Sequence, residues 1–325
     1  MYYIIVNPSS GSGRGLVLWK KLEPIIKSRE LEYQVIYTVS SIHIAETVKK
    51  ITSFRSEQTD REEAIRLIVL GGDGTLNEVV SNIADFEHVL VGYIPSGSSN
   101  DFARGLGLQT DPETIFRTIL EDHVVRKLDI GTLQYDNYSS PISRLPNMEF
   151  CTTHRFDVSA GIGYDAAVCE EALLSKSKNL LNRFGLGKLT YLVIGIKKLA
   201  KSRSTTCDLI LDDTRTIHLE HFLFAAFMIQ KYEGGGFKFC PNADESDGIL
   251  DLCVAGNIKK LTFLAALPFA FRGTHYRFRG INHYTARKAE VRTKEPQWVH
   301  TDGEVSVKSD HITVYCEKQV LNLLM

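Results

Sequence analysis

The sequence predicts an α/β domain followed by a β-rich domain, and we expect the second to be sandwich-like. Apolar strands alternate with helical periodicity over residues 1–125, which is typical of a doubly wound parallel sheet with helices on both faces. From about Val124, short alternating segments rich in β-branched residues dominate and favour a largely antiparallel fold. We therefore expect one domain over 1–125, joined by residues of about 318–325, and a second over 126–317.

Each strand of the first domain is predicted by an apolar run, and each helix by periodicity between the runs. Leu76, Val79 and Val80, for example, lie on one apolar helix stripe. The expected strands are 2–6, 33–38, 65–70 and 89–94, and the expected helices are 15–28, 41–54, 75–84, 100–106 and 112–121.

The second domain is predicted to hold many strands and few helices. Residues 135–150, which are rich in polar residues and contain two prolines, are expected to be a surface loop. Strands are expected at 126–134, 154–160, 204–212, 214–220, 222–229, 249–255, 285–293, 297–301 and 305–316, and helices near 163–174, 187–201 and 259–270.

Composition excludes several classes of protein. The chain has 325 residues, of which 43% are hydrophobic, and a formal net charge of −1, which argues against bulk nucleic-acid binding. The longest apolar stretches, such as 261–271, fall short of the roughly 20 residues that cross a bilayer. The first residues read as a strand, not a signal peptide, and the six cysteines include no C-x-x-C pair. We expect a cytoplasmic protein with reduced thiols.

Polar loops rich in glycine and serine follow the first, third and fourth predicted strands, at 7–13, 71–74 and 96–99. In parallel sheets ligands bind at the carboxyl ends of strands, so these loops should form one site. The second loop leads into a helix, and a glycine turn before a helix N-terminus suits a phosphate. Asp73 would oppose an anion there, unless it holds a metal ion or takes a proton. A purely structural turn is the alternative interpretation.

Other phosphate-binding motifs are absent from the sequence. The first loop has Gly11, Gly13 and Gly15 after a strand but lacks the full G-x-G-x-x-G spacing, and no acidic residue ends the second strand. The P-loop pattern, H-E-x-x-H and G-x-S-x-G do not occur. A phosphate loop is favoured over a dinucleotide-binding one.

Asp101 and Arg104 in the loop after the fourth strand have two interpretations. They lie one helical turn apart and could form a surface ion pair that adds little stability. Beside the Asp73 loop, a second carboxylate and a guanidinium could instead be partners for a metal ion and a phosphate. Both interpretations stay open, and the second is favoured.

Taken together, these loops resemble those of bacterial diacylglycerol kinases and related lipid kinases. The resemblance covers Asn7-Pro8-x-Ser-Gly, 71–78 and 97–104, and it continues into the second domain through 160–166, 241–248 and 302–304. It implies a nucleotide-binding first domain with an ATP site. By position that site would use Asn7, Ser9, Ser10, Gly11, Ser12, Gly13, Thr38, Gly72, Asp73, Gly74, Thr75, Leu76, Asn77, Glu78 and Ser98. Ser98 stands where the family usually has threonine.

The resemblance also implies a general base and a magnesium site. The base would be Glu304, the glutamate of Asp-Gly-Glu, and Mg²⁺ would be held by Asp244, Asp247 and the carbonyl of Ile249. From residue type alone, Asp244 to Gly248 would be a β-turn. Asp73, with Asp101, would position a catalytic Mg²⁺, although Asp73 could instead be the base. We expect Asp73 and Glu304 to serve one reaction centre.

A lipid substrate requires peripheral contact with a membrane, which we expect at the inner face. Basic and aromatic residues together suit an anionic bilayer surface, although a solvated face is the commoner meaning of such runs. Two groups fit: one of Lys197, Lys198, Lys201 and Arg203, and one of Arg272, Arg277, Arg279, Arg287 and Lys288 with Phe269, Phe271, Tyr276 and Phe278.

The function that follows is an ATP- and Mg²⁺-dependent kinase of phospholipid biosynthesis that phosphorylates a lipid alcohol, foremost diacylglycerol to give phosphatidic acid. The alternatives are a kinase of another acceptor (a sphingoid base, a polyprenol or NAD) and a catalytically silent nucleotide-sensing module. Nucleic acid is not an expected partner, and a homodimer is left open.

Overall fold

The computed structural model describes residues 1–53, 64–108, 111–121, 124–139, 150–174, 194–200, 202 and 204–325. Lys201, Arg203, residues 140–149 of the expected loop and most of the helix expected over 187–201 lie outside the described residues. The chain divides into two compact units: Met1–Ile130 with Lys318–Met325 (unit 1), and Gly131–Glu317 (unit 2). Strands β5 (Val125–Asn137) and β13 (Glu304–Leu324) contribute residues to both units.

Unit 1 is a parallel sheet in the order β2 (Tyr33–Tyr37), β1 (Tyr2–Val6), β3 (Ile65–Gly71), β4 (Val89–Pro95) and the end of β13. Residues Asn322 to Leu324 of β13 pair in parallel with Leu90 to Gly92 of β4. The predicted strands are confirmed here because buried parallel strands appear in sequence as continuous apolar runs between turn residues.

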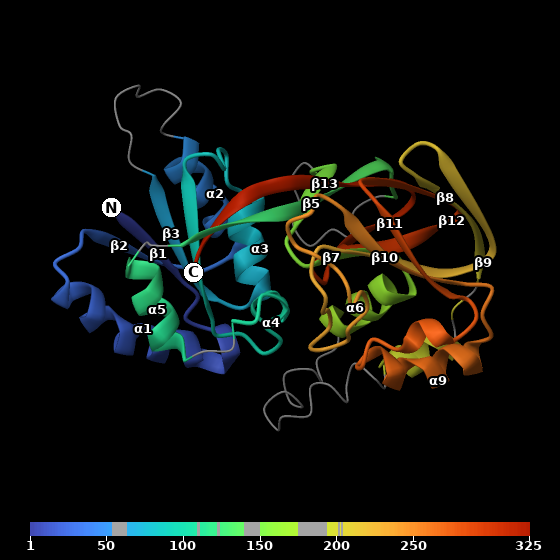
Figure 1. The fold of residues 1–325 in the computed structure, drawn as a ribbon, viewed down its shortest axis with the longest axis horizontal. Helices are drawn as coiled ribbons and strands as arrows, with labels where there is room; N and C mark the ends of the chain where they lie inside the picture. Colours follow the sequence, from blue (N-terminus) through green and yellow to red (C-terminus); the bar gives the residue numbers. More distant parts are fainter. Residues whose placement is uncertain are drawn as a thin grey trace. The chain divides into compact units, whose positions relative to one another are not determined.

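Helices cover both faces of the unit 1 sheet (Figure 1). Helices α1 (Ser10–Ser28) and α5 (Pro112–Glu121) bury Trp19 and Phe116 against alternate residues of β1, β3 and β4. Helices α2 (Ser41–Ser53) and α3 (Asp73–Ser81) pack against each other, and α3 contacts β3. The short helix α4 (Asp101–Gly105) follows β4. The doubly wound α/β prediction is therefore confirmed.

Unit 2 is built on antiparallel strands that close on themselves. Strand β8 pairs with both β9 and β12, and β7 also pairs with both. Strands β10 and β11 extend from β9, while β13, β5 and β6 extend from β12. The strands are β6 (Thr153–Phe156), β7 (Ser159–Gly163), β8 (Thr205–Leu211), β9 (Arg215–Met228), β10 (Leu250–Gly256), β11 (Ile281–Ala286) and β12 (Lys288–Thr301).

Side chains of β9 and β10 alternate between two cores. Ala225 and Phe227 face a core between the strands, whereas Phe224 and Ala226 face a second core. The second core is covered by α6 (Tyr164–Leu174), α9 (Lys260–Ala270) and the helical residues 194–200; the short 3₁₀ helix η1 (His275–Arg277) lies beside it. This period of two is the signature of strands that are buried on both faces.

Several expected boundaries in unit 2 were wrong. Strand β5 continues to Asn137, into the expected loop of 135–150, and β13 runs to Leu324, past the expected 305–316. Residues 214–220 and 222–229 form one strand, β9, and 285–293 and 297–301 divide differently between β11 and β12. The register of β12 shifts between Arg292 and Gln297, which is where the sequence suggested a break. Residues 154–160 split into β6 and β7.

Trp19 should contribute strongly to the stability of unit 1. It is fully buried and makes edge-on contacts with Tyr33 and Phe116, at ring-centroid distances of 6.2 and 6.3 Å. We expect Trp19→Ala to lower the free energy of unfolding by about 3–5 kcal/mol, measured by urea denaturation followed by circular dichroism. Val17→Ala, at a position that is 57% exposed on the same helix, should change it by less than about 1 kcal/mol. Equal effects of the two substitutions would contradict this core assignment.

Candidate active site

The three glycine-rich loops of unit 1 meet at the carboxyl edge of its sheet. Strand β3 lies between β1 and β4, and the Ser96 N–H donates to the carbonyl of Gly71 at 2.7 Å. The turns approach so closely that a Cβ atom on Gly97 would lie 2.6 Å from the Cα of Gly72. Glycine is therefore required where these turns cross.

The first loop contains three successive residues in the left-handed backbone conformation. Gly11, Ser12 and Gly13 all have positive φ angles, of 56°, 63° and 92°, shortly after Ser9, which has helical angles. Backbone of this kind turns successive N–H groups toward a concavity that binds anions. At Gly13 no atom lies within 4 Å of where a Cβ would be, so the concave side has space for a ligand.

Two side-chain hydrogen bonds join the loops. The Asn7 side chain donates to the hydroxyl of Thr75 at 2.9 Å, and the buried hydroxyls of Ser10 and Ser96 lie 2.6 Å apart. Three of the residues that the sequence assigned to ATP binding, Asn7, Ser10 and Thr75, thus hold the loops together. A Cβ on Gly11 would lie 2.3 Å from the Ser96 carbonyl oxygen, so this contact too depends on glycine.

Helix α3 begins at the second loop. Gly72 is its N-cap, with extended backbone angles, and its carbonyl accepts the N–H groups of Thr75 and Leu76. Gly74 in the first turn is exposed, and no atom lies within 4 Å of where its Cβ would be. The positive end of a nine-residue helix dipole therefore has open space beside it, which is favourable for a phosphate.

Asp73 has a structural role that the sequence did not indicate. Its carboxylate accepts the backbone N–H groups of Asp101 and Phe102, at 3.1 and 3.3 Å. These are the first N–H groups of α4, whose own N-cap, Asn100, is left-handed with φ of 49° and makes no side-chain capping bond. Asp73 therefore caps α4 from a distant part of the chain.

The ion pair between Asp101 and Arg104 forms. Arg104 Nη1 lies 2.5 Å from Asp101 Oδ1, and its Nη2 donates to the carbonyl of Ser99 at 3.1 Å. Asp101 is only 4% exposed, so the pair is better shielded from water than a surface pair. Because Arg104 bonds both Asp101 and the Ser99 carbonyl, it fixes the conformation of the loop after β4.

A groove of about 450 Å³ lies beside the first and third loops. Two cations line it, Arg14 and Lys21, together with Ser12, Gly13, Ser96 and Gly97. Lys21 was not among the residues predicted from the sequence, although it lies seven residues after Arg14 and so on the same face of α1. Thr38, Leu76, Asn77, Glu78 and Ser98 are not among the described residues that line this groove.

In unit 2, the Asp-Gly-Glu segment forms the tight turn between β12 and β13. Asp302 and Gly303 are left-handed, and the Asp302 carboxylate accepts the N–H groups of Asp157, Val158 and Ser159 at 2.8 to 3.1 Å. Burial raises the pKa of Asp302, and these donors and Asp157 oppose that rise. Glu304 is exposed, and its carboxylate makes no hydrogen bond or ion pair with the described residues. The turn is held by Asp302, and Glu304 is left accessible.

His300 lies buried behind this turn between two carboxylates. Its Nε2 lies 3.3 Å from Asp165 and 3.4 Å from Glu233. Burial disfavours the charged ring, but the hydrogen bond to Asp165 and the charges of Glu233 and Asp302 outweigh it and raise the pKa of His300 to about 9. The Gly303 N–H donates to Nδ1, so this bond must open when Nδ1 takes up a proton. The sequence analysis missed His300, whose only signal was its place two residues before Asp302.

The proposed magnesium ligands lie in one exposed turn between β9 and β10. Asp244 accepts hydrogen bonds from the N–H and hydroxyl of Ser246, and Asp247 accepts the N–H of Ile249 at 2.9 Å. The β-turn interpretation of this segment thus agrees with the geometry. Both carboxylates are exposed, and two carboxylates with a carbonyl form an oxygen donor set that fits Mg²⁺.

A second cavity, of about 510 Å³, lies within unit 2. Its walls include Tyr164, Leu223 and Trp298, and Lys197 and Lys198 also line it. Lys198 pairs with Glu170 at 3.0 Å and with Glu171 at 3.1 Å. Apolar and aromatic walls stand beside charged and polar groups, which also include Glu171 and Lys308, so the cavity suits a molecule with both apolar and polar parts.

Comparison with known proteins agrees with this architecture. The model of the family described as diacylglycerol kinase catalytic domain matches residues 1–133, and that of the YegS C-terminal NAD kinase beta sandwich-like domain matches 158–325, more than half of the chain. The chain belongs to the bacterial diacylglycerol kinase and lipid kinase family. It is therefore a kinase-family protein, and the expected C-terminal β-sandwich-like domain is confirmed.

Individual relatives align over almost the whole chain. YtlR of Bacillus subtilis, named as a candidate lipid kinase, is 26% identical over 94% of this chain and 93% of its own length. A diacylglycerol kinase of Bacillus subtilis is 28% identical over 93% of this chain and 88% of its own length. The crystal structure of a Bacillus anthracis protein, described as a candidate diacylglycerol kinase, aligns over 99% of this chain and 96% of that protein at a TM-score of 0.71. At 22% identity it shows the shared fold alone.

The capping role of Asp73 can be measured separately from catalysis. We expect Asp73→Ala to lower the free energy of unfolding by about 0.5–2 kcal/mol, because two N–H groups of α4 lose their acceptor. Asp73→Asn should cost less, since its amide oxygen still accepts. Urea denaturation measures both. Asp85→Ala, which breaks an exposed pair with His88, is the control and should cost under about 1 kcal/mol. An Asp73→Ala cost no larger than this would rule out the cap.

Proposed function

We propose that this protein transfers the γ-phosphate of ATP to the hydroxyl of a lipid, foremost diacylglycerol, to give phosphatidic acid. The observation that carries the proposal is the left-handed first loop beside the open N-terminus of α3, at the edge where glycines bring the loops together. Membership in the lipid kinase family, and relatives named diacylglycerol kinase, support the acceptor class.

ATP binding is proposed for unit 1. The N–H groups of the first loop and of the first turn of α3 would bind phosphate oxygens, and Arg14 and Lys21 would balance their charge. Asp73 and Asp101 would support this site indirectly, because Asp73 accepts an N–H group of α4 and Asp101 pairs with Arg104 on that helix. A metal-binding role for them, as well as ATP contacts of Thr38 and Ser98, stays a prediction.

Magnesium is proposed for the turn of Asp244, Asp247 and Ile249, whose oxygen donors fit it. A bound Mg²⁺ supplies neutralisation of negative charge in phosphoryl-transfer enzymes. The carboxylates of Asp244 and Asp247 are exposed and the turn is held by its own hydrogen bonds, so little rearrangement is needed for binding.

Glu304 is proposed as the general base. Its carboxylate would accept the proton of the lipid hydroxyl while the hydroxyl oxygen bonds to the γ-phosphorus and ADP leaves. The exposure of Glu304 on a turn that Asp302 holds supports this role, because a base must be accessible yet fixed in position. The cavity of Tyr164, Leu223 and Trp298 is proposed as the acceptor site.

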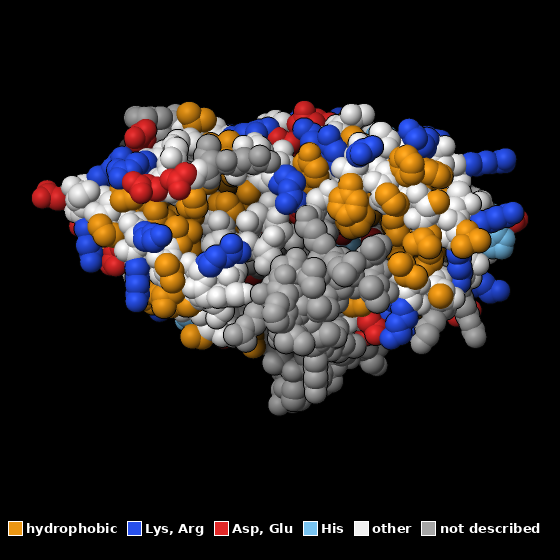
Figure 2. All heavy atoms as spheres, turned by 90° about the horizontal axis from the view of Figure 1, so that it is seen from below, with side chains coloured by type: hydrophobic (Ala, Val, Ile, Leu, Met, Phe, Trp, Pro, Cys, Tyr) orange, Lys and Arg blue, Asp and Glu red, His pale blue; other side chains and the backbone are white. Residues whose placement is uncertain are grey.

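Docking on an anionic membrane surface is proposed for α9. Leu261 is 81% exposed and Phe271 at the end of the helix 47%, and Ala265 and Pro268 on the same side are also exposed. Exposed Lys259, Arg272, Arg277 and Arg279 adjoin this stripe, and Figure 2 shows basic and hydrophobic side chains together on a face of the molecule.

Two of the basic residues expected at the membrane lie elsewhere: Arg287 and Lys288 are at the turn with Asp212 and Asp213. Among the described residues, no helix combines the length and apolar character needed to span a membrane.

The proposed chemistry is tested with γ-labelled ATP and a panel of acceptors. Diacylglycerol should be labelled fastest, and Glu304→Gln should lower kcat by about 10²–10⁴-fold with little change in the KM for ATP, because only the proton acceptor is lost. Glu295→Gln, an exposed glutamate on β12, is the matched control and should keep full activity.

Several outcomes would overturn the proposal. Faster labelling of a sphingoid base, a polyprenol or NAD would establish another acceptor. Tight ATP binding without transfer to any acceptor would favour the silent sensing module. Full activity of Glu304→Gln would leave the reaction without the proposed base.

The membrane surface is tested by sedimentation with vesicles that contain phosphatidylglycerol. The double variant Leu261→Glu/Phe271→Glu should bind at least about tenfold more weakly, because a buried apolar side chain contributes about 1.5–3 kcal/mol. Val124→Glu/Val125→Glu adds the same charge at two exposed sites of unit 1 and should bind like the unaltered protein. Equal loss in both double variants would show a general charge effect and exclude α9 as the docking surface.

A further inference from the structure

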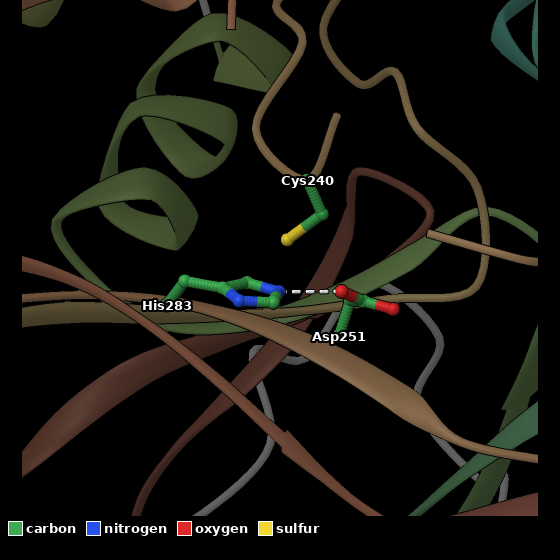
Figure 3. A group of neighbouring side chains, drawn as sticks. All are labelled: Cys240, Asp251 and His283. Atoms are coloured by element: carbon green, nitrogen blue, oxygen red, sulfur yellow. Dashed lines mark hydrogen bonds and ion pairs between the residues drawn. The ribbon is translucent and has the colours of Figure 1, made fainter. Parts of the chain in front are cut away.

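We propose that Cys240, Asp251 and His283 form a binding site for a transition-metal ion, with Zn²⁺ the best fit. The ligand atoms of the three side chains, one sulfur, one oxygen and one nitrogen, all lie within 4.8 Å of one another. Figure 3 shows the three side chains converging from separate segments of unit 2 on one point. This site is distinct from the magnesium turn and from the groove in unit 1.

Two neighbouring strands and one loop supply the ligands. Asp251 lies on β10 and His283 on β11, where Cys253 pairs directly with His283, so both side chains stand on the same face of the sheet. His283 Nε2 lies 2.5 Å from Asp251 Oδ1. Cys240 comes from the segment between β9 and β10 and places its sulfur beside this pair. The site therefore joins a loop to the sheet.

The donor set selects the metal. Thiolate, imidazole and carboxylate are the three ligand types that zinc takes, at about 2.0–2.3 Å. Two tetrahedral ligands of one zinc ion lie farther apart than the 2.5 Å between His283 Nε2 and Asp251 Oδ1, so this hydrogen bond must open when both atoms bind the ion. A hard ion such as Mg²⁺ disfavours sulfur and nitrogen, which separates this site chemically from the Asp244 turn.

Burial and access both suit an ion. Cys240 is fully buried and Asp251 is 5% exposed, whereas the side chain of His283 is 35% exposed and leaves a way in from solvent. Burial raises the pKa of the Cys240 thiol, so an entering ion must displace the thiol proton to water. Tyr276, whose hydroxyl donates to the Phe239 carbonyl at 2.6 Å, also lies 3.6 Å from the Cys240 sulfur and would steady this ligand.

Other groups in unit 2 show why the cysteine matters. The pair of His218 and Asp208, at 2.6 Å, has the same two side chains but is exposed and has no sulfur ligand beside it among the described residues. The group of Asp165, Glu233 and His300 also lacks sulfur, and its histidine accepts a hydrogen bond from Gly303 in the turn before Glu304. Cys240, Asp251 and His283 combine a soft ligand with an acid–histidine pair, and that combination indicates zinc.

The consequence of binding would be a cross-link. Cys240 lies in the same segment between β9 and β10 as Asp244 and Asp247, and this segment contains no named helix or strand. Long segments without regular structure in compact domains are commonly functional. An ion that ties Cys240 to β10 and β11 would hold this segment against the sheet and stabilise unit 2.

The experiment measures metal binding by the full-length protein without reference to kinase activity. Protein stripped with a chelator and dialysed should bind one equivalent of Zn²⁺, measured by elemental analysis, and its melting temperature should rise by about 5 °C or more. Co²⁺ in the same site should show a sulfur-to-cobalt absorption band. Both Cys240→Ala and His283→Ala should fail to bind the equivalent of Zn²⁺, and with Co²⁺ they should lack the sulfur-to-cobalt absorption band.

Matched controls make the outcome decisive. Cys207→Ala removes another buried cysteine of unit 2, and His218→Ala removes the histidine of the exposed pair; both should keep the equivalent of zinc. Should Cys240→Ala unfold, the more conservative Cys240→Ser and His283→Gln still report on the site, with circular dichroism as the check of folding. The proposal is wrong if the unaltered protein binds no zinc, or if the Cys240 and His283 variants bind as much as the controls.

Discussion

The active-site edge of unit 1 depends on backbone-to-backbone contact between glycine turns. Gly72 and Gly97 approach so closely that a methyl group on either would reach the other residue, and Gly11 is pressed in the same way against the carbonyl of Ser96. A side chain at any of these positions would separate loops whose strands are already fixed by parallel pairing. The orientation of α3, the cap of α4 and the groove beside α1 all follow from this contact.

Much of this arrangement could be predicted from the sequence, because its determinants are local. The strands of unit 1 are continuous apolar runs that end in glycine, proline or polar residues, and parallel pairing then requires their loops to meet. In unit 2 the strands were found but their continuity was not. Strand β12 passes through Pro296 with a shift of register, and a proline inside a polar stretch predicts a break unless the pairing partners are known.

What the sequence could not show are contacts between residues far apart in the chain. Asp73 looked like a metal ligand or a base because a carboxylate in a phosphate loop requires a reason. The structure adds a structural reason, since 28 and 29 residues later two N–H groups of α4 need an acceptor. His300 gave no signal beyond its place two residues before Asp302, because its carboxylate partners, Asp165 and Glu233, lie in two other segments. Neither partner is recognisable without the fold.

The Asp-Gly-Glu turn separates structural and chemical roles within three residues. Asp302 directs its carboxylate inward to three N–H groups, so its loss would release the turn, whereas Glu304 faces solvent and is available to a substrate. In the proposed function the glycine-rich loops of unit 1 would bind ATP, and they would not distinguish one lipid alcohol from another. On that proposal, selection of the acceptor would depend on unit 2, where Tyr164, Leu223 and Trp298 line the cavity proposed as the acceptor site. Differences in acceptor between members of the family should accordingly be found in that cavity and not in the glycine loops.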